Sequence, residues 1–256
     1  WESGTDETAC ARYDAGRDRI VMIKAREAFG IEALYPLQEE VIRGILTGKR
    51  QLVLLPTGYG KSLCFLLPAL MLKGATLVIY PLLALMQDQK RRMEQAGICA
   101  VELKGGQTKS QRAAALEALG SGKAQIVLAN PEVLRDRGLV EVLASCDISH
   151  IAIDEAHCVA EWGESFRPAY LELGRVISRL GSQRVTAFTA TASPQLQERI
   201  QELLFGKGER ALVVQGNLAN SDNICKRSSL GRISSGTCQK MYSLDEIGRA
   251  SCRERV

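Results

Sequence analysis

Runs of aliphatic and β-branched residues alternate with longer segments of helical periodicity between residues 20 and 215. Several of these runs are apolar at every position, which indicates strands that are buried on both faces. The pattern predicts strands at 51–55, 76–80, 100–103, 125–129, 150–153, 184–188 and 211–215. Between them it predicts helices that include 62–72, 83–96, 110–119, 169–180 and 194–204.

The alternation of strands and helices predicts an α/β domain with a mostly parallel sheet and helices on both of its faces. No internal repeat or low-complexity linker interrupts the pattern, so we expect one domain over residues 20–224. Residues 1–19 are not assigned to that domain. From residue 225 onward the periodicity is lost and Ser, Gly and Arg accumulate, which predicts an irregular tail over 225–256.

Composition narrows the class of protein. The chain has 256 residues, of which 46% are hydrophobic, enough for a sizeable core and too many for a disordered chain. Its eight cysteines are scattered without a C-x-x-C pair, so we expect neither a zinc site nor a disulfide framework. No apolar run reaches the roughly 18 residues of a membrane span and no signal peptide opens the chain, so we expect a soluble protein without membrane contact.

The two ends of the chain change how its charge is interpreted. The net charge is +4, but residues 225–256 alone carry seven Lys and Arg against three Asp and Glu, so the remainder is neutral. The basic balance is therefore no indication of nucleic-acid binding.

The chain opens with Trp1, which we interpret as a partial reading frame. Residues 247–256 read as a translated sequencing adapter, and a natural basic tail is the alternative.

The strongest local motif is LPTGYGKS at residues 55–62, which follows a predicted strand and opens a predicted helix. Gly58 and Gly60 allow backbone N–H groups to approach phosphate oxygens, and the helix N-terminus adds partial positive charge. Lys61 would reach the β- and γ-phosphates of a nucleotide. An ordinary glycine-rich turn is the alternative. The motif predicts nucleotide contacts at Thr57, Gly58, Tyr59, Gly60, Lys61 and Ser62.

A second motif lies about ninety residues further on, where an apolar strand runs into Asp154-Glu155-Ala156-His157. An aspartate at the end of a strand can hold Mg²⁺ through water, and the adjacent glutamate can polarise the water that attacks the γ-phosphate. We expect His157 to hydrogen-bond towards the next motif, and a purely structural histidine is the alternative. Together with the phosphate loop, the motif predicts catalytic roles for Lys61, Asp154, Glu155 and His157, and Mg²⁺ binding by Ser62 and Asp154.

A third motif, TATA at residues 189–192, directly follows another predicted strand. The hydroxyl groups of Thr189 and Thr191 could link the nucleotide site to a neighbouring domain, although this string is common in loops. In this order the three motifs resemble those of superfamily 2 helicases. That resemblance implies a RecA-like P-loop NTPase fold, with ATP and Mg²⁺ as cofactors.

A longer match points to one family. Residues 154–174 resemble the RecQ family of DNA helicases, in which the DEAH box continues into an aromatic-rich loop, H-C-x-x-x-W-G-x-x-F-R-P. The matching residues are His157, Cys158, Trp162, Gly163, Phe166, Arg167 and Pro168. The resemblance covers residues 20–224 and implies the first motor domain of an ATP-dependent DNA helicase that translocates 3′ to 5′.

Residues ahead of the phosphate loop fit the same family. Gln38 resembles the glutamine that recognises adenine in these proteins. Two positions depart from the pattern: Ile31 stands where the family often has an aromatic residue, and Tyr35 stands where it often has Arg. We expect Tyr35 to present its ring to the base instead.

Three further segments are implied to contact DNA. PLLALMQDQ at 81–89 resembles a motif that holds the DNA backbone, which implies contacts at Pro81 and Gln87. Asn130-Pro131-Glu132 resembles a second such motif, with Asn in place of the commoner Ala or Thr. In the aromatic-rich loop, Trp162 and Phe166 would stack on bases and Arg167 would hold a phosphate, which would couple DNA to the adjacent carboxylates. Simple core packing of both rings is the alternative.

The resemblance also implies parts that the sequence does not contain. Motors of this class hydrolyse ATP between two RecA-like domains, and no second set of motifs is present, so we expect the chain to bind nucleotide weakly and to turn over little alone. The implied partners are single-stranded or forked DNA and a second motor domain, in a bacterial cytoplasm or a eukaryotic nucleus. A non-catalytic nucleotide- and DNA-binding module is the alternative.

Overall fold

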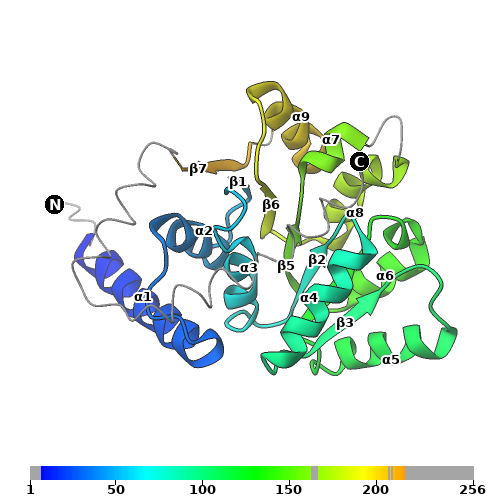
Figure 1. Ribbon diagram of the computed structural model, residues 1–256, viewed down its shortest axis with the longest axis horizontal. Helices are drawn as coiled ribbons and strands as arrows, with labels where there is room; N and C mark the ends of the chain where they lie inside the picture. Colours follow the sequence, from blue (N-terminus) through cyan, green and yellow to red (C-terminus); the bar gives the residue numbers. More distant parts are fainter. Residues whose placement is uncertain (1–6, 163–166, 207, 209, 217–256) are drawn as a thin grey trace, which may run out of the picture.

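The computed structural model describes residues 7–162, 167–206, 208 and 210–216. The side chains of residues 7–15, Arg17 and Trp162 are left out of this description. Its centre is a parallel sheet in the order β3-β4-β2-β5-β6-β1-β7 (Figure 1). The strands are β1 Gln51–Leu54, β2 Ala75–Ile79, β3 Ala100–Leu103, β4 Ile126–Ala129, β5 Ile148–Ile153, β6 Val185–Thr189 and β7 Leu212–Gln215. All seven predicted strands are therefore confirmed, within two residues at each end.

Helices cover both faces of this sheet. The helices are α1 Glu7–Phe29, α2 Pro36–Leu46, α3 Lys61–Ala69, α4 Leu83–Gln95, α5 Lys109–Gly120, α6 Arg137–Ser145, α7 His157–Trp162, α8 Leu173–Leu180 and α9 Pro194–Phe205. Short 3₁₀ turns lie at Val133–Arg135 and Pro168–Glu172. Buried residues of α2, α3 and α4 pack on one face, those of α5, α6, α8 and α9 pack on the other, and α1 packs against α2 and α3. The predicted fold class is confirmed.

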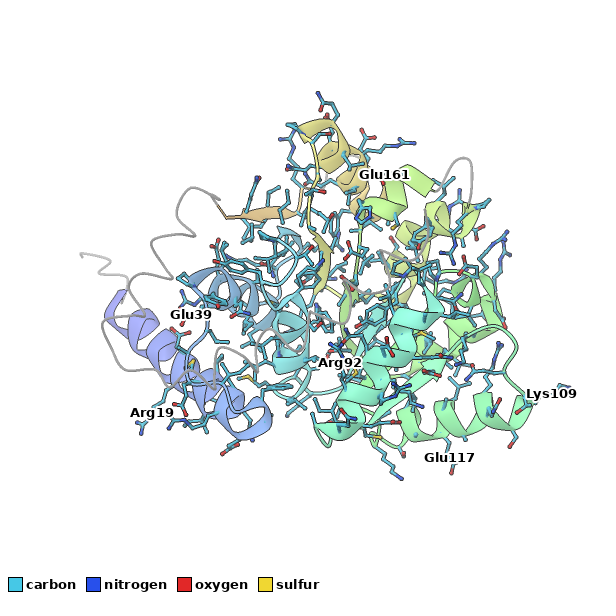
Figure 2. All side chains as sticks on the ribbon, in the orientation of Figure 1. Arg19, Glu39, Arg92, Lys109, Glu117 and Glu161 are labelled. Carbon is cyan, nitrogen blue, oxygen red and sulfur yellow. The ribbon has the colours of Figure 1, made fainter. Side chains whose placement is uncertain are left out.

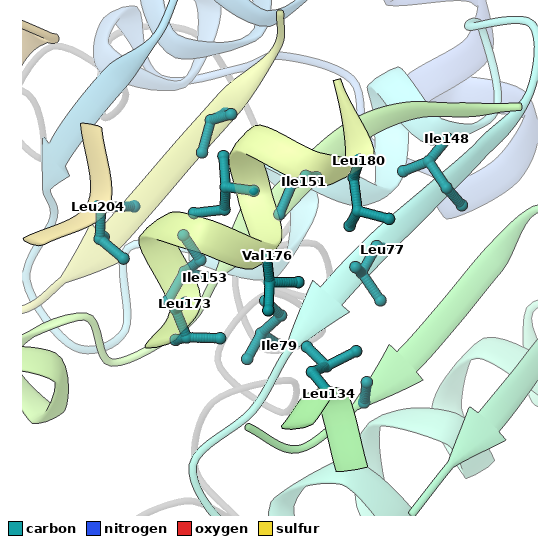
Figure 3. Close-up of a cluster of buried hydrophobic side chains, with 14 of the residues drawn as sticks. Leu77, Ile79, Leu134, Ile148, Ile151, Ile153, Leu173, Val176, Leu180 and Leu204 are labelled. Carbon is teal, nitrogen blue, oxygen red and sulfur yellow. The ribbon is translucent and has the colours of Figure 1, made fainter. Parts of the chain in front are cut away.

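The strands are rich in apolar residues because all of them except β7 contribute side chains to both cores. On β2, Leu77 and Ile79 join Ile151 and Ile153 of β5 beneath α8, as Figure 3 shows. The alternate residues of the same strands, such as Val78, face the opposite core. Polar side chains stay on the outer faces of the helices; Figure 2 shows Lys109 and Glu117 projecting outward from α5.

Some boundaries differ from the expected ones. The predicted helix at 169–180 is divided, because Pro168 opens a 3₁₀ turn and α8 begins only at Leu173. The expected domain start at residue 20 falls inside α1, whose apolar residues do not gather clearly enough on one face to show a helical pattern. The expected end at 224, the irregular tail and the adapter-like residues lie outside the described residues. In the described part of the chain, no helix has the length and apolar character needed to cross a bilayer.

His150 makes stability depend on pH. Its imidazole is fully buried on β5, with Nε2 3.1 Å from the Thr186 hydroxyl, and burial with help from the Arg184 charge lowers its pKa from 6.5 to about 3. Below pH 6.5 the unfolded chain takes up a proton that the folded chain excludes. We therefore expect the free energy of unfolding to fall by about 1 kcal/mol per pH unit as the pH decreases from 6.5 towards 5.

Denaturant titrations on both sides of pH 6.5 measure this effect. The His150→Gln variant removes the titrating group, so its stability should change much less over the same range. An identical pH slope in both proteins would contradict the assignment.

Candidate functional site

The phosphate loop lies between the end of β1 and the start of α3. Gly58 and Gly60 have φ angles of +89° and +72°, which side-chain-bearing residues rarely adopt. Gly60 is the N-cap of α3 and supplies no side-chain cap, so the positive end of the helix opens directly on the loop. Lys61 and Ser62 form its first turn and are half-buried, whereas Thr57 is exposed. These groups fit the phosphates of a nucleotide and an accompanying Mg²⁺.

Gln38 braces this loop from α2. Its side chain is fully buried, and its Nε2 donates to the backbone oxygens of Tyr59 at 3.0 Å and Gly60 at 3.4 Å. Its Oε1 accepts the backbone N–H of Tyr35 at 2.9 Å. Both amide hydrogens are thereby used, so Gln38 can donate to a base only by exchanging one of these bonds. The observed role of Gln38 is to hold the loop.

Gly60→Ala is expected to destabilise the loop. A Cβ there would lie 2.7 Å from Gln38 Nε2 and would have to keep a left-handed φ, so we expect a loss of about 1–3 kcal/mol in stability and weaker nucleotide binding. Gly48→Ala is the matched control, because Gly48 has a φ of +84° and no atom within 4 Å of a new Cβ. Denaturant titration and binding of a fluorescent ATP analogue measure both effects. Equal losses in the two variants would contradict the contact with Gln38.

Two tyrosines lie beside the loop. The rings of Tyr35 and Tyr59 have centroids 4.8 Å apart at an interplanar angle of 40°, and both side chains are half-buried. This tilted packing is a favourable geometry for aromatic pairs. Ile31, in contrast, is buried in the core between α1 and α2, so the residue that departs from the family pattern has a packing role here.

The DEAH residues form a turn between three strands. The Asp154 N–H donates to Ile79 O of β2 at 2.9 Å, and the Ala156 N–H donates to Phe188 O of β6 at 2.7 Å. Between them, Glu155 has a φ of +48°, the one positive value among the described residues other than glycine. Its N–H donates to Asp154 Oδ1 at 3.0 Å. The turn fixes both carboxylates at the carboxyl edge of the sheet, beside the phosphate loop.

Lys61 and Glu155 join the first two motifs directly. Lys61 Nζ lies 2.8 Å from Glu155 Oε1, and the side chains are only 14% and 28% exposed. Partial burial strengthens such a pair relative to one in bulk water. The Lys61 ammonium is therefore held by a carboxylate at the point where the γ-phosphate of a nucleotide would compete for it.

His157 extends this network to the third motif. Its Nδ1 lies 3.3 Å from Glu155 Oε2 and 3.2 Å from Thr189 Oγ1. The Thr189 hydroxyl donates to Thr191 O at 2.9 Å, so it can only accept from the histidine, which assigns the ring proton to Nδ1. The expected hydrogen bond from His157 to the TATA motif is thus present in the structure. The Thr189 side chain is buried, whereas Thr191 is exposed.

Arg167 connects the segments that were expected to hold DNA. The side chain of Trp162 and all of residues 163–166 lie outside the described residues, so the stacking expected of Trp162 and Phe166 stays a prediction. Arg167 Nε donates to Glu132 Oε1 at 2.7 Å, and a further N–H of its guanidinium donates to Pro81 O. It also lies over the Tyr170 ring, 5.5 Å from the centroid.

Glu132 belongs to a segment that was expected to hold the DNA backbone, but the sequence pattern gave its side chain no role of its own. Its second carboxylate oxygen accepts the side-chain amide of Asn130, so Asn130 orients the carboxylate that holds Arg167. This contact gives a physical role to the unusual Asn at that position. Gln87, on the first half of α4, is exposed.

Other groups near the site are kept uncharged. Burial and the nearby Glu155 and Glu161 charges raise the pKa of the Cys158 thiol to about 12, and burial raises that of Cys64 to about 12 as well. Tyr80, at the end of β2, is buried, and burial together with the Asp154 charge raises its pKa well above 10. Among the described residues, no three His, Cys, Asp or Glu side chains gather as they would around a metal ion.

Comparison with known proteins extends these observations. The family model described as DEAD/DEAH box helicase matches residues 35–199. The ATP-dependent DNA helicase RecQ of Pasteurella multocida is 40% identical over 172 residues, 67% of this chain and 27% of the relative. The ATP-dependent helicase wrn-1 of Caenorhabditis elegans is 38% identical over 178 residues, 68% of this chain and 17% of the relative. The chain therefore spans less than a third of either relative.

Solved structures show the same fold. The DUF1998 helicase MrfA, bound to DNA and AMPPNP, has a TM-score of 0.60 at 26% identity, over 77% of this chain and 29% of that one. The DEAD-box helicase Mss116, bound to ssRNA and UDP-BeF, has a TM-score of 0.59 at 21% identity, over 75% of this chain and 42% of that one. These likenesses agree with a RecA-like arrangement of the sheet and its helices.

Proposed function

The chain belongs to the DEAD/DEAH box helicase family, and on this premise we propose that it is the first motor domain of an ATP-dependent, 3′-to-5′ DNA helicase of RecQ type. The proposal rests mainly on one observation, the series of contacts from Lys61 through Glu155 and His157 to Thr189. These contacts join three motifs at one edge of the sheet. Similarity to RecQ proteins of about 40% identity supports DNA as the nucleic acid.

The nucleotide half of the site uses groups on the phosphate loop and the DEAH turn. The loop glycines and the start of α3 would cradle the phosphates of ATP, with Lys61 on the β- and γ-phosphates. Ser62 and Asp154 would hold Mg²⁺, whose charge offsets that developing on the phosphates. Tyr35 and Tyr59 would lie beside the base, and Gln38 would reach it after releasing one backbone carbonyl.

Residues of the DEAH turn would have separate roles in ATP hydrolysis. Glu155 would orient and polarise the attacking water, which requires that its carboxylate leave the Lys61 ammonium. His157 would keep the other oxygen of Glu155 in place and would transmit movement of the TATA motif to it. These roles make Lys61, Asp154 and Glu155 the catalytic residues and His157 a positioning residue.

DNA would bind along the same edge. Pro81, Gln87, Thr189 and Thr191 lie at or near the carboxyl ends of strands, and Arg167 joins Pro81 to Glu132. We propose that single-stranded or forked DNA contacts this edge and that Trp162 and Phe166 stack on bases there. The proposed location of the protein is a bacterial cytoplasm or a eukaryotic nucleus.

Two measurements test the function. Titration of a fluorescent ATP analogue into the chain should show binding that requires Mg²⁺, and the intact protein should hydrolyse ATP faster when single-stranded DNA is added. Failure to bind nucleotide would overturn the proposal. Nucleotide and DNA binding without DNA-stimulated hydrolysis in the intact protein would instead support a non-catalytic binding module.

A further inference from the structure

The edge of the sheet opposite the nucleotide site carries a groove. A cavity of about 720 Å³ is bordered by residues that precede or begin β2, β5 and β6, and by the ends of α2 and α3. A second cavity of about 440 Å³ is bordered by residues that precede β1 and β7. Gln183 lines both, so they adjoin. Because all strands are parallel, this amino-terminal groove lies a full strand length from the DEAH turn.

The groove has a strong excess of positive charge. Among the described residues, its two parts are lined by five cationic side chains and by one carboxylate, that of Asp147; the cations are Lys49, Arg50, Lys73, Arg184 and Arg210. Within the described part of the chain, Lys49, Lys73, Arg184 and Arg210 form no ion pair. Some cations elsewhere on the surface do have acidic partners, as in Arg43–Asp18, Lys90–Glu94 and Arg112–Asp136. The excess is therefore local, since residues 1–224 are neutral in sum.

Arg184 is partly withdrawn from solvent. It lies just before β6, is half-buried, and its Nε is inaccessible to solvent without a hydrogen-bond partner among the described residues. Its charge also helps to lower the pKa of the buried His150. Withdrawing part of a guanidinium from water without a hydrogen-bond acceptor costs free energy. A carboxylate bound at Arg184 would supply that acceptor.

The uncharged residues that line the groove indicate which class of anionic partner it fits. Aliphatic or thioether side chains lie beside the cations, namely those of Ile20, Leu46, Met71, Leu72 and Leu212. Ile20 and Leu212 are 53% and 43% exposed. Among the described residues no aromatic side chain borders either cavity, so this part of the groove offers no stacking surface of the kind on which single-stranded nucleic acids depend. Cations interspersed with aliphatic surface instead complement a peptide that carries both carboxylates and aliphatic side chains.

We propose that the amino-terminal groove binds an acidic, aliphatic-rich peptide segment of a partner protein, with Arg184 pairing with one of its carboxylates. The apolar side chains of the peptide cover Leu46, Met71 and Leu212, and Lys49, Lys73 and Arg210 surround its acidic groups. Binding there leaves the carboxyl edge accessible to nucleotide and DNA. The groove is thus an attachment surface, separate from the motor's own substrates.

Fluorescence anisotropy with a labelled peptide of alternating aspartate and leucine tests the proposal on the full chain. We expect binding that weakens as salt is added, and a loss of affinity of about tenfold or more in Arg184→Gln. Because Arg184 is half-buried, the exposed pair Lys49→Glu and Arg210→Glu provides a second variant with the same expected loss. Binding of the ATP analogue should be unchanged in both, which separates this test from that of the motor function.

Lys123→Glu is the matched control, since Lys123 is an exposed lysine on the same side of the sheet that borders neither cavity. It should bind the peptide as the unchanged chain does. A peptide of alternating aspartate and serine should bind at least several-fold more weakly, because it lacks the aliphatic side chains. The proposal would be overturned if the peptide did not bind, or if Lys123→Glu lost as much peptide affinity as the groove variants. It would also be overturned if oligothymidylate bound more tightly than the peptide and depended on the same groove cations.

Discussion

Glu155→Gln is expected to lower the rate of ATP hydrolysis by about 10²–10⁴-fold in an intact protein that carries this domain. The amide keeps the size of the side chain but cannot accept a proton from the attacking water. It also keeps an oxygen near His157 Nδ1, so the hydrogen bond that orients residue 155 can persist. Steady-state turnover in the presence of single-stranded DNA measures the effect, and Glu117→Gln on the outer face of α5 is the control.

Nucleotide affinity should respond in the opposite way. In the structure, Glu155 and the phosphates compete for the same ammonium, 2.8 Å from the carboxylate. The neutral amide competes less, so the variant should bind the ATP analogue as tightly as the unchanged protein or more tightly. A large fall in affinity together with turnover would show that Glu155 supports the fold of the site and would contradict a role in the chemical step.

Lys61→Ala is expected to weaken Mg-ATP binding by about 10- to 100-fold, the loss typical of one charged hydrogen bond. The substitution also removes the ammonium that pairs with the Glu155 carboxylate, which keeps its contact with His157 Nδ1. Titration of the ATP analogue into the purified chain measures the loss without requiring turnover. Lys104→Ala is the control, because Lys104 also pairs with a glutamate, Glu102, far from the phosphate loop. Unchanged binding in Lys61→Ala would remove the phosphate loop from the proposed function.

The strands and motifs could be predicted because each depends on short stretches of sequence. Most strands pack beneath helices on both faces, so their apolar character appears as short apolar runs in the sequence. The phosphate loop and DEAH turn are likewise local, and parallel strands bring their ends to one edge. The contact between His157 and Thr189 followed from the same reasoning, since β5 and β6 are neighbours in the sheet.

Contacts between side chains from distant segments could not be predicted in this way. Arg167 was expected to be available for phosphate, but it is held by Glu132 and Pro81, which are 35 and 86 residues away in sequence. Gln38 was expected to face a base, but its amide is used by the loop backbone. Helix α1 escaped the sequence pattern because its apolar residues do not gather clearly on one face. The amino-terminal groove had no motif at all, because its cations come from four separate loops.

The strand order also bears on synthesis of the protein. Strand β1 is the first to emerge from the ribosome, yet its neighbours β6 and β7 are the last, and Gln51 pairs with Thr186 and Leu212. The chain must close these long loops before β1 gains either partner, which is slow and costly in entropy. A nascent chain therefore carries the apolar β1 without its sheet neighbours for most of translation, exposed to chaperones and to other nascent chains. Competence to bind nucleotide should arise late, only after β7 has left the exit tunnel.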